Sequence, residues 1–263
     1  MYNKPLLISA ENLVVKGDGG AEIINVPHLE IEQGFTAIVG PSGSGKSTLL
    51  NSLVGLRTLS SGVIRHYDAE GFVSYTHSKK PAIGSSQTSE YRSKMTGYIA
   101  QNPHLDAWLT PTQQIYDQHA VRGNKLDVNY VNHLIDSLDI STIFEKHSPK
   151  FLGNIRPSRE RLSSVLSGGE KQRLAVAVAL AHMPYIVFGD EPASALGTKH
   201  KKPLYELLRN TVDVLGNSVV IVSHDPNVFD FTDQVIYVED GVVVQNKTET
   251  DSEKNLYLPK RTN

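Results

Sequence analysis

A glycine-rich loop at residues 40–45 constrains the fold of this chain more than any other feature of its sequence. The apolar run Phe35–Val39 precedes the loop and has the character of a buried strand. Apolar residues then recur at the spacing of one helical face, at Leu49, Leu50, Leu53 and Val54. Gly55 stands where such a helix would end. The chain is therefore expected to contain a strand, a tight loop and a helix in direct succession.

The loop has the residue types that phosphate binding requires. It consists of Gly40, Pro41, Ser42, Gly43, Ser44, Gly45, Lys46 and Ser47. Glycine lets consecutive backbone N–H groups face phosphate oxygens, and the following helix directs its positive end at the same group. Lys46 is expected on the β and γ phosphates, the Ser47 hydroxyl on magnesium, and Thr48 where the helix begins. A glycine-rich turn without a ligand is the alternative, but motif and context agree on a phosphate loop.

An acidic pair follows a second buried-strand run, Tyr185–Phe188. Carboxylates at the carboxyl end of such a strand lie where parallel α/β sheets bind ligands. Asp190 suits magnesium through a water molecule, and Glu191 is the candidate that polarises an attacking water. An ordinary surface turn is the alternative for this pair alone, and the phosphate loop upstream makes the functional interpretation the better one.

Composition narrows the class of protein. With 263 residues, 39% of them apolar, the chain can form one large α/β domain with a subdomain. Its 26 basic and 28 acidic residues give a net charge of -2, so no nucleic-acid partner is expected. The absence of cysteine excludes disulfides and thiolate metal sites. Met1–Ala10 lacks a signal-peptide core, and the longest apolar stretch, Leu174–Ala181, is well short of the roughly 20 residues of a membrane span.

The rest of the chain is expected to alternate strands with one helical region. Short apolar runs predict strands at Leu6–Ile8, Leu13–Val15, Ile23–Val26, Val219–Val222, Val235–Val238 and Val242–Val244, the last two joined by a hairpin turn at Asp240 and Gly241. Residues 66–94 are polar and are predicted to be mostly surface loop. Between 103 and 165 a helical subdomain is expected, with one apolar face formed by Val128, Val131, Leu134, Ile135 and Leu138.

Residues 166–173 carry a third motif. Ser167 followed three residues later by Glu170 predicts a capping box, and the helix after it should continue to Ala181 before Pro184 ends it. Two glycines at such a helix start expose free N–H groups. A plain helix cap without a ligand is the alternative for this motif taken alone.

Together these motifs identify a family resemblance. Leu166, Ser167, Gly168, Gly169, Glu170, Lys171, Gln172 and Arg173 resemble the signature of ATP-binding-cassette (ABC) ATPases, usually Leu-Ser-Gly-Gly-Gln, with Glu170 replacing the glutamine. The resemblance covers about residues 6–245. It implies an α/β fold with a P-loop NTPase core and mixed β-sheet, an N-terminal antiparallel β subdomain and an inserted α-helical subdomain at about 103–165. Residues 1–245 would form this single RecA-like domain, and 246–263 a polar C-terminal tail.

The resemblance also implies roles for individual residues. In the family, the helix start at Ser167, Gly168, Gly169 and Glu170 binds the γ-phosphate of ATP held by the opposite subunit. Gln101 matches the glutamine that contacts magnesium and the attacking water and relays the nucleotide state to the membrane subunit. His224 matches the switch histidine that contacts the γ-phosphate near the catalytic Glu191. Asp190 and Ser47 match the magnesium ligands.

Two positions depart from the family pattern. Gly197 replaces the usual aspartate of the D-loop, which weakens an expected contact between the two sites. The aromatic residue that usually stacks on adenine is missing near Val15, Lys16 and Gly17. Two outcomes stay open: base selectivity is looser, or another residue such as Tyr2 stacks on the base.

The resemblance implies an ATPase motor of a membrane transporter, with ATP and Mg²⁺, resembling the lipoprotein-release and macrolide-export systems. The expected partners are a transmembrane permease on a separate chain and a second ABC subunit, identical or related. The expected location is cytoplasmic, peripheral on the inner face of the cell membrane. Two alternatives stay open: a soluble, non-transport ABC ATPase of an assembly scaffold, of the iron–sulfur type, and a module that senses ATP without turnover. The second is weakened because Lys46, Ser47, Asp190, Glu191 and His224 are all present.

Overall fold

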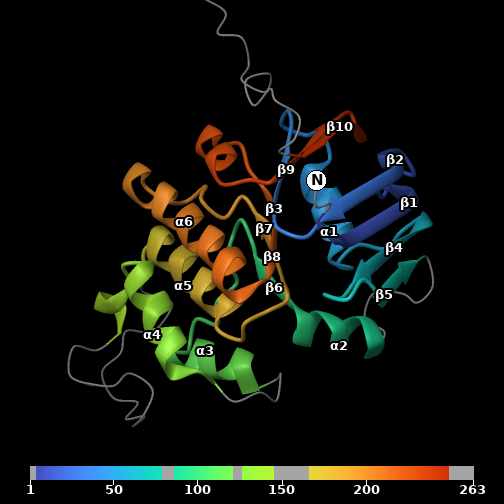
Figure 1. Ribbon diagram of the computed structural model, residues 1–263. Helices are drawn as coiled ribbons and strands as arrows, with labels where there is room; N and C mark the ends of the chain where they lie inside the picture. The colour runs from blue at the N-terminus through green and yellow to red at the C-terminus, as the bar shows by residue number, and fades with distance from the viewer. Residues whose placement is uncertain (1–3, 79–85, 121–125, 145–165, 249–263) are drawn as a thin grey trace, which may run out of the picture. The chain divides into compact units, whose positions relative to one another are not determined.

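The computed structural model describes residues 4–78, 86–120, 126–144 and 166–248 (Figure 1). The chain divides into two compact units. One unit combines Met1–Ser89 with Ser218–Asn263, and the other is Glu90–Asn217. The division places the phosphate loop in the first unit and the acidic pair in the second, and each unit is described by itself below.

The first unit begins with a four-stranded antiparallel sheet in the order β2-β1-β4-β5. Its strands are β1 (Leu6–Lys16), β2 (Glu22–Glu32), β4 (Ser61–Tyr67) and β5 (Val73–Ser78). Leu7, Leu13 and Val15 of β1 are buried, as the apolar pattern of the sequence predicts. This sheet confirms the expected N-terminal antiparallel β subdomain.

The same unit also contains strands of a mixed sheet. The strand β3 (Phe35–Val39) pairs in parallel with β8 (Ser218–Val222) and β9 (Gln234–Glu239), and β10 (Val242–Thr248) pairs with β9 in antiparallel. The β9–β10 turn has φ 46° at Asp240 and 79° at Gly241, which is the left-handed geometry of the predicted hairpin turn. The helix α1 (Lys46–Leu53) follows the loop after β3, and the short helix η3 (Pro226–Asp230) follows β8.

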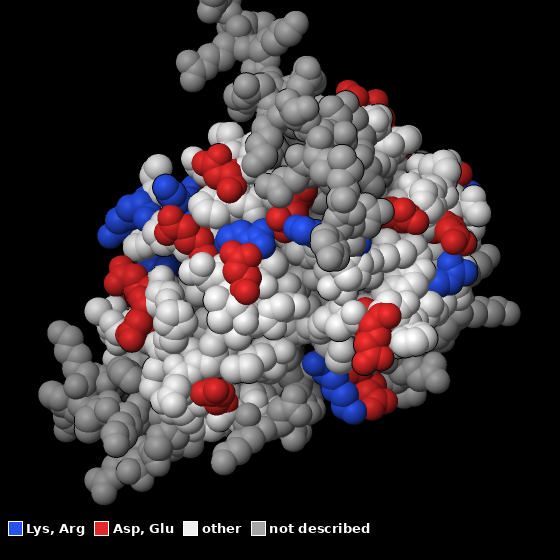
Figure 2. All heavy atoms as spheres, viewed as in Figure 1, with Lys and Arg blue, Asp and Glu red and all other residues white. Residues whose placement is uncertain are grey.

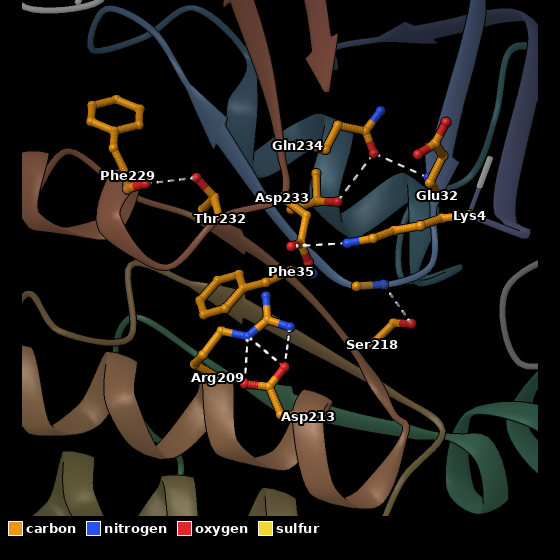
Figure 3. A network of polar contacts seen from close by, with 12 residues as sticks. Lys4, Glu32, Phe35, Arg209, Asp213, Ser218, Phe229, Thr232, Asp233 and Gln234 are labelled. Carbon is orange, nitrogen blue, oxygen red and sulfur yellow. Dashed lines mark hydrogen bonds and ion pairs between the residues drawn. The ribbon is translucent and has the colours of Figure 1, made fainter. Parts of the chain in front are cut away.

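Polar side chains join β2, β3 and β9 inside this unit (Figure 3). Gln234 accepts hydrogen bonds from the Glu32 N–H at 3.0 Å and the Thr36 hydroxyl at 3.3 Å, and it donates to the Glu30 carbonyl at 2.9 Å. Asp233 accepts from the Phe35 N–H at 2.7 Å and pairs with Lys4 at 2.9 Å. These contacts fix the start of β3, which is the end of that strand away from residues 40–45.

The second unit contains two parallel strands and most of the helices. The strands are β6 (Thr96–Ile99) and β7 (Ile186–Asp190). The helices are α2 (Ser86–Met95), which belongs to this unit from Glu90 onward and leads into β6, then α3 (Pro111–Ala120), α4 (Val128–Ser137), η1 (Ser141–Ile143), α5 (Gly168–Leu180) and α6 (Thr198–Leu215). Helix α5 contacts β6, α3 and α4, and therefore forms the centre of this unit.

Helix α4 confirms the helix expected within residues 103–165. Asp127 caps it by accepting hydrogen bonds from the backbone N–H groups of Asn129 and Tyr130 at 3.0 Å. The predicted apolar face is buried at Val131, Leu134, Ile135 and Leu138. The limits of the helical subdomain, the single domain over 1–245 and the tail from 246 stay predictions.

The expectation of surface loop over residues 66–94 was wrong, because this stretch contains the end of β4, the strand β5 and the helix α2. The strand β5 buries Tyr75 and His77, whose polar atoms hide the alternation that marks a strand. Helix α2 is almost entirely polar and has no apolar stripe, so its periodicity gives no helical signal.

Acidic and basic side chains are interspersed over the face drawn in Figure 2, which agrees with the nearly balanced charge of the sequence. None of the helices in residues 4–78, 86–120, 126–144 and 166–248 has both the length and the apolar character needed to cross a bilayer.

Candidate functional site

The backbone of the phosphate loop requires glycine at two positions. Gly40 has φ 146°, and a Cβ there would collide with the carbonyl oxygen of Val238 on β9. Gly45 has φ 95°, and a Cβ there would lie 2.7 Å from the Ile24 side chain. Both φ angles lie in the region that side chains disfavour. The loop is also anchored from outside, because the Gly241 N–H donates to the Ser44 carbonyl at 3.0 Å.

The start of α1 is open to an anion. Its N-cap residue is Gly45, which has no side chain to satisfy the first N–H groups of the helix. Gly43, at φ 77°, would have no atom of the described residues within 4 Å of an added Cβ, so a ligand can approach the backbone there. The hydroxyl of Ser44 is buried and has no hydrogen-bond partner in the described part of the chain. Unsatisfied donors at a helix start fit phosphate oxygens.

Lys46 brings its positive charge to the same loop. Its ammonium group donates to the carbonyl oxygens of Gly40 at 3.0 Å and Pro41 at 2.5 Å, and the residue is only 5% exposed. The side chain is thus folded over the loop, where an anion would need it. Ser47, in the first turn of α1, offers a hydroxyl oxygen of the kind that binds Mg²⁺. The residues of this unit therefore fit the phosphates of a nucleotide and one ligand of its magnesium ion. In the second unit, Asp190 at the end of β7 offers a carboxylate oxygen, which Mg²⁺ also prefers.

Two predicted catalytic residues meet in the second unit. The strands β6 and β7 run in parallel with Ile99 opposite Gly189, so the residues that follow them emerge at the same edge. Gln101 follows β6, and its amide nitrogen donates to a carboxylate oxygen of Glu191 at 3.3 Å. Asp190, the last residue of β7, is 8% exposed. The structure thus brings together residues that are 90 positions apart in the sequence.

The backbone at Glu191 is strained. Its φ of 48° places a glutamate in the left-handed region, which costs about 1 kcal/mol or more for a residue other than glycine. A turn holds it there, since the Ser194 N–H donates to the Glu191 carbonyl at 3.0 Å. Strain of this kind persists where the surrounding structure holds a residue in place, and it is concentrated at functional sites.

The predicted capping box at the start of α5 is present. The Ser167 hydroxyl accepts from the Glu170 N–H at 3.3 Å, and the Glu170 carboxylate accepts from the Ser167 N–H at 2.8 Å. The Glu170 side chain therefore turns back onto the chain. Ser167 and Gly168 are exposed, while Gly169 is half-buried. A Cβ on Gly168 would meet no atom of the described residues within 4 Å.

His224 lies in the first unit, two residues after β8 ends. It is exposed, and the backbone around it is set by the Asp225 N–H, which donates to the Ser223 hydroxyl at 3.1 Å. Asp225 in turn caps η3 by accepting from the Asn227 N–H at 3.0 Å. His224 and the phosphate loop thus belong to one unit, and Gln101, Asp190, Glu191 and residues 167–170 to the other.

The two departures from the family pattern are visible as well. Gly197 is the N-cap of α6, with no described atom within 4 Å of an added Cβ. Val15 is buried and Lys16 is exposed at the end of β1, while Tyr2 lies outside the described residues.

The sequence interpretation gave no role to Gln172, which is fully buried on α5. A polar residue in register with the buried Val176 and Ala179 is the signal that could have drawn attention to it.

Comparison with known proteins agrees with this geometry. Residues 25–194 match the family described as ABC transporter. The chain is 31% identical over 244 residues to an uncharacterized ABC transporter ATP-binding protein, MJ0796, of Methanocaldococcus jannaschii, covering 90% of this chain and 95% of that protein. The chain belongs to the ABC transporter family. Within it, this cassette is an ATP-binding subunit that hydrolyses ATP, with Mg²⁺ as the associated ion.

Other relatives have more specific names. The cassette is 29% identical over 232 residues to the lipoprotein-releasing system ATP-binding protein LolD of Bacteroides thetaiotaomicron, covering 88% of this chain and 96% of that protein. It is 32% identical over 245 residues to the macrolide export ATP-binding/permease protein MacB of Vibrio parahaemolyticus, where it covers 91% of this chain but 34% of that protein.

A solved dimeric structure of MJ0796, described as a bacterial ABC transporter cassette, superposes with a TM-score of 0.73 at 27% identity. The superposition covers 92% of this chain and 98% of that one. The predicted P-loop NTPase fold of the α/β class is thereby confirmed. These relatives give no support to the iron–sulfur assembly scaffold that the sequence left open.

Proposed function

We propose that this cassette works as one half of a motor in which two cassettes close on two ATP molecules and drive a membrane partner. Each cassette supplies residues 167–170 to the γ-phosphate held by residues 40–48 of the other. One observation supports this most directly: Gly168 is exposed and no described atom lies near its Cβ position, so the packing of its own chain does not require glycine there. Glycine at that position is explained if a ligand approaches the backbone from outside.

The same proposal assigns a role to each polar residue. The backbone of residues 40–48 and the Lys46 ammonium group bind the phosphates, and Ser47 and Asp190 hold the magnesium ion. Bound Mg²⁺ supplies the positive charge that neutralises the phosphate oxygens during transfer. Glu191 orients and polarises the attacking water, and His224 contacts the γ-phosphate. Gln101 positions the Glu191 carboxylate and contacts the magnesium ion.

The transport partner is proposed from the relatives. MacB is named as a combined ATP-binding and permease protein, and this chain matches its cassette-sized part. We infer a permease on a separate chain, with the cassette on the cytoplasmic side of the cell membrane. The second cassette is a copy of this chain or a close relative. Lipoprotein release and macrolide export give the class of transporter that the cassette resembles. The segment after Gln101 is the proposed docking region, where Trp108 is 82% exposed.

Replacing Glu191 by Gln tests the proposed cycle. The variant should keep its affinity for ATP, lose turnover and accumulate as an ATP-bound dimer, because water activation is lost while the phosphate loop is intact. Light scattering after size exclusion, with magnesium-ATP and with magnesium-ADP, measures this directly. Glu70→Gln, in an exposed turn of the first unit, is the matched control and should behave as the unaltered protein. A Glu191→Gln protein that stays monomeric in ATP, or that turns over normally, contradicts the proposal.

A further inference from the structure

Gln172 is buried in a way that packing alone does not explain. It is fully buried in α5, and its amide nitrogen donates to the Ala100 carbonyl at 3.2 Å. Its amide oxygen has no hydrogen-bond partner among the residues that the structure describes. A buried acceptor without a partner is destabilising, and an apolar side chain of the same size would avoid that penalty. The glutamine is therefore retained for what its N–H group does at Ala100.

Helix α5 and strand β6 are joined at two points. Near one end, a Cβ on Gly97 would collide with the Ala179 carbonyl, so glycine permits direct contact between the two backbones. Near the other end, Gln172 reaches Ala100. Seven residues of helix rise about 10.5 Å, and three residues of strand rise about 10 Å. The two attachment points are therefore equally spaced along both elements, and the strand is expected to follow the helix when the helix moves.

The contact between Gln172 and Ala100 connects residues 167–170 with the Glu191 carboxylate. The capping box fixes the start of α5 only one turn before Gln172, and the Lys171 N–H donates to the Ser167 carbonyl at 2.9 Å. On the other side, Ala100 directly precedes Gln101, which donates to Glu191 at 3.3 Å. Every link in this path lies in one unit, so it is carried by contacts that the structure describes.

We propose that Gln172 is a positioning residue that couples the start of α5 to Gln101 and Glu191 by holding the Ala100 carbonyl. This inference rests on the proposed function, because it is the γ-phosphate of the opposite subunit that would act on residues 167–170. Contact there fixes α5, the Gln172 amide fixes Ala100, and Gln101 then holds the Glu191 carboxylate in its reactive position.

Gln172→Met tests the coupling, because methionine has nearly the same length and fills the same space without a donor. We expect the ATPase kcat to fall about tenfold, while the KM for ATP stays within twofold. The melting temperature should change little, because the loss of the donor to the Ala100 carbonyl is offset by removal of the unpaired amide oxygen. In the Glu191→Gln background, the ATP-dependent dimer should form as before, because the phosphate contacts are untouched.

Gln234→Met is the matched control. Gln234 is also a buried glutamine bonded to a backbone carbonyl, but both ends of its amide have partners and it lies in the other unit. Its loss should lower the melting temperature and leave kcat unchanged. If Gln172→Met lowers the melting temperature and keeps kcat within twofold of the unaltered protein, Gln172 is structural and the proposal is wrong. Normal turnover of the unaltered protein and ATP-dependent dimerisation of Glu191→Gln keep that outcome separate from failure of the proposed function.

Discussion

Replacing His66 by Gln is expected to remove the contribution of one buried histidine to the pH dependence of stability. His66 is a completely buried residue of β4 in the antiparallel sheet. Its Nε2 donates to the Leu53 carbonyl at the end of α1 at 2.8 Å, and its ring contacts Tyr75 edge-on. Burial lowers the pKa of His66 from 6.5 to about 4, opposed by the Leu53 bond and assisted by His77. The neutral ring thus stabilises the end of the phosphate-loop helix.

The size of the effect follows from that pKa. Because the unfolded chain binds the proton more tightly, stability is complete above pH 6.5 and falls as the pH drops toward 4. The difference of 6.5 minus about 4 corresponds to about 3 kcal/mol in total, or about 1.4 kcal/mol for each pH unit within this range. Glutamine can keep the hydrogen bond to Leu53 and does not titrate.

Urea unfolding followed by circular dichroism, repeated between pH 4.5 and 7.5, measures this difference. The free energy of unfolding of the unaltered protein should fall more steeply with decreasing pH than that of His66→Gln. His133→Gln, at an exposed position of α4, is the matched control and should keep the steep dependence. Parallel pH profiles for the unaltered protein and His66→Gln would refute the argument that burial holds this ring neutral.

Two further variants probe the nucleotide and the membrane partner. Lys46→Ala should abolish binding of magnesium-ATP in calorimetry, because Lys46 is the one charged residue in the loop 40–48. Lys94→Ala, at an exposed position, is the control and should bind normally. Binding of magnesium-ATP by Lys46→Ala would contradict the assigned role. Trp108→Ser should leave the ATPase rate of the isolated cassette within twofold and reduce co-purification with a polytopic membrane subunit, and undiminished co-purification would remove Trp108 from the docking region.

Much of the fold could be predicted because its strands and helices carry clear periodicity. The runs before and after the phosphate loop became β3 and α1, and the capping pair Ser167 and Glu170 marked the start of α5 to the residue. The polar stretch 66–94 could not be predicted, since β5 buries Tyr75 and His77 rather than aliphatic residues. The burial of β5 depends on its pairing with β4, and the residues of β5 alone do not reveal that pairing.

The sequence allowed candidate site residues to be proposed by type, but it did not indicate which of them are in contact. Gln101 and Glu191 were chosen from separate motifs, and only the parallel pairing of β6 with β7 brings them within 3.3 Å. The left-handed backbone of Glu191 likewise depends on a turn closed by Ser194 and has no mark in the sequence. Gln172 went unnoticed because its importance lies in a bond to a distant backbone carbonyl.

The central claim is that two cassettes complete each other's ATP pockets, and cross-linking tests it most directly. The chain has no cysteine, so Ser42→Cys and Lys171→Cys together give one defined pair beside the proposed contact, while Gly168, whose backbone is proposed to face the γ-phosphate, stays glycine. The two cysteines are introduced into the Glu191→Gln protein. A short bis-maleimide should then cross-link two chains in magnesium-ATP but not in magnesium-ADP. Neither single-cysteine protein should give the cross-linked dimer in magnesium-ATP. Monomers alone in ATP, or equal cross-linking with either nucleotide, would contradict the account.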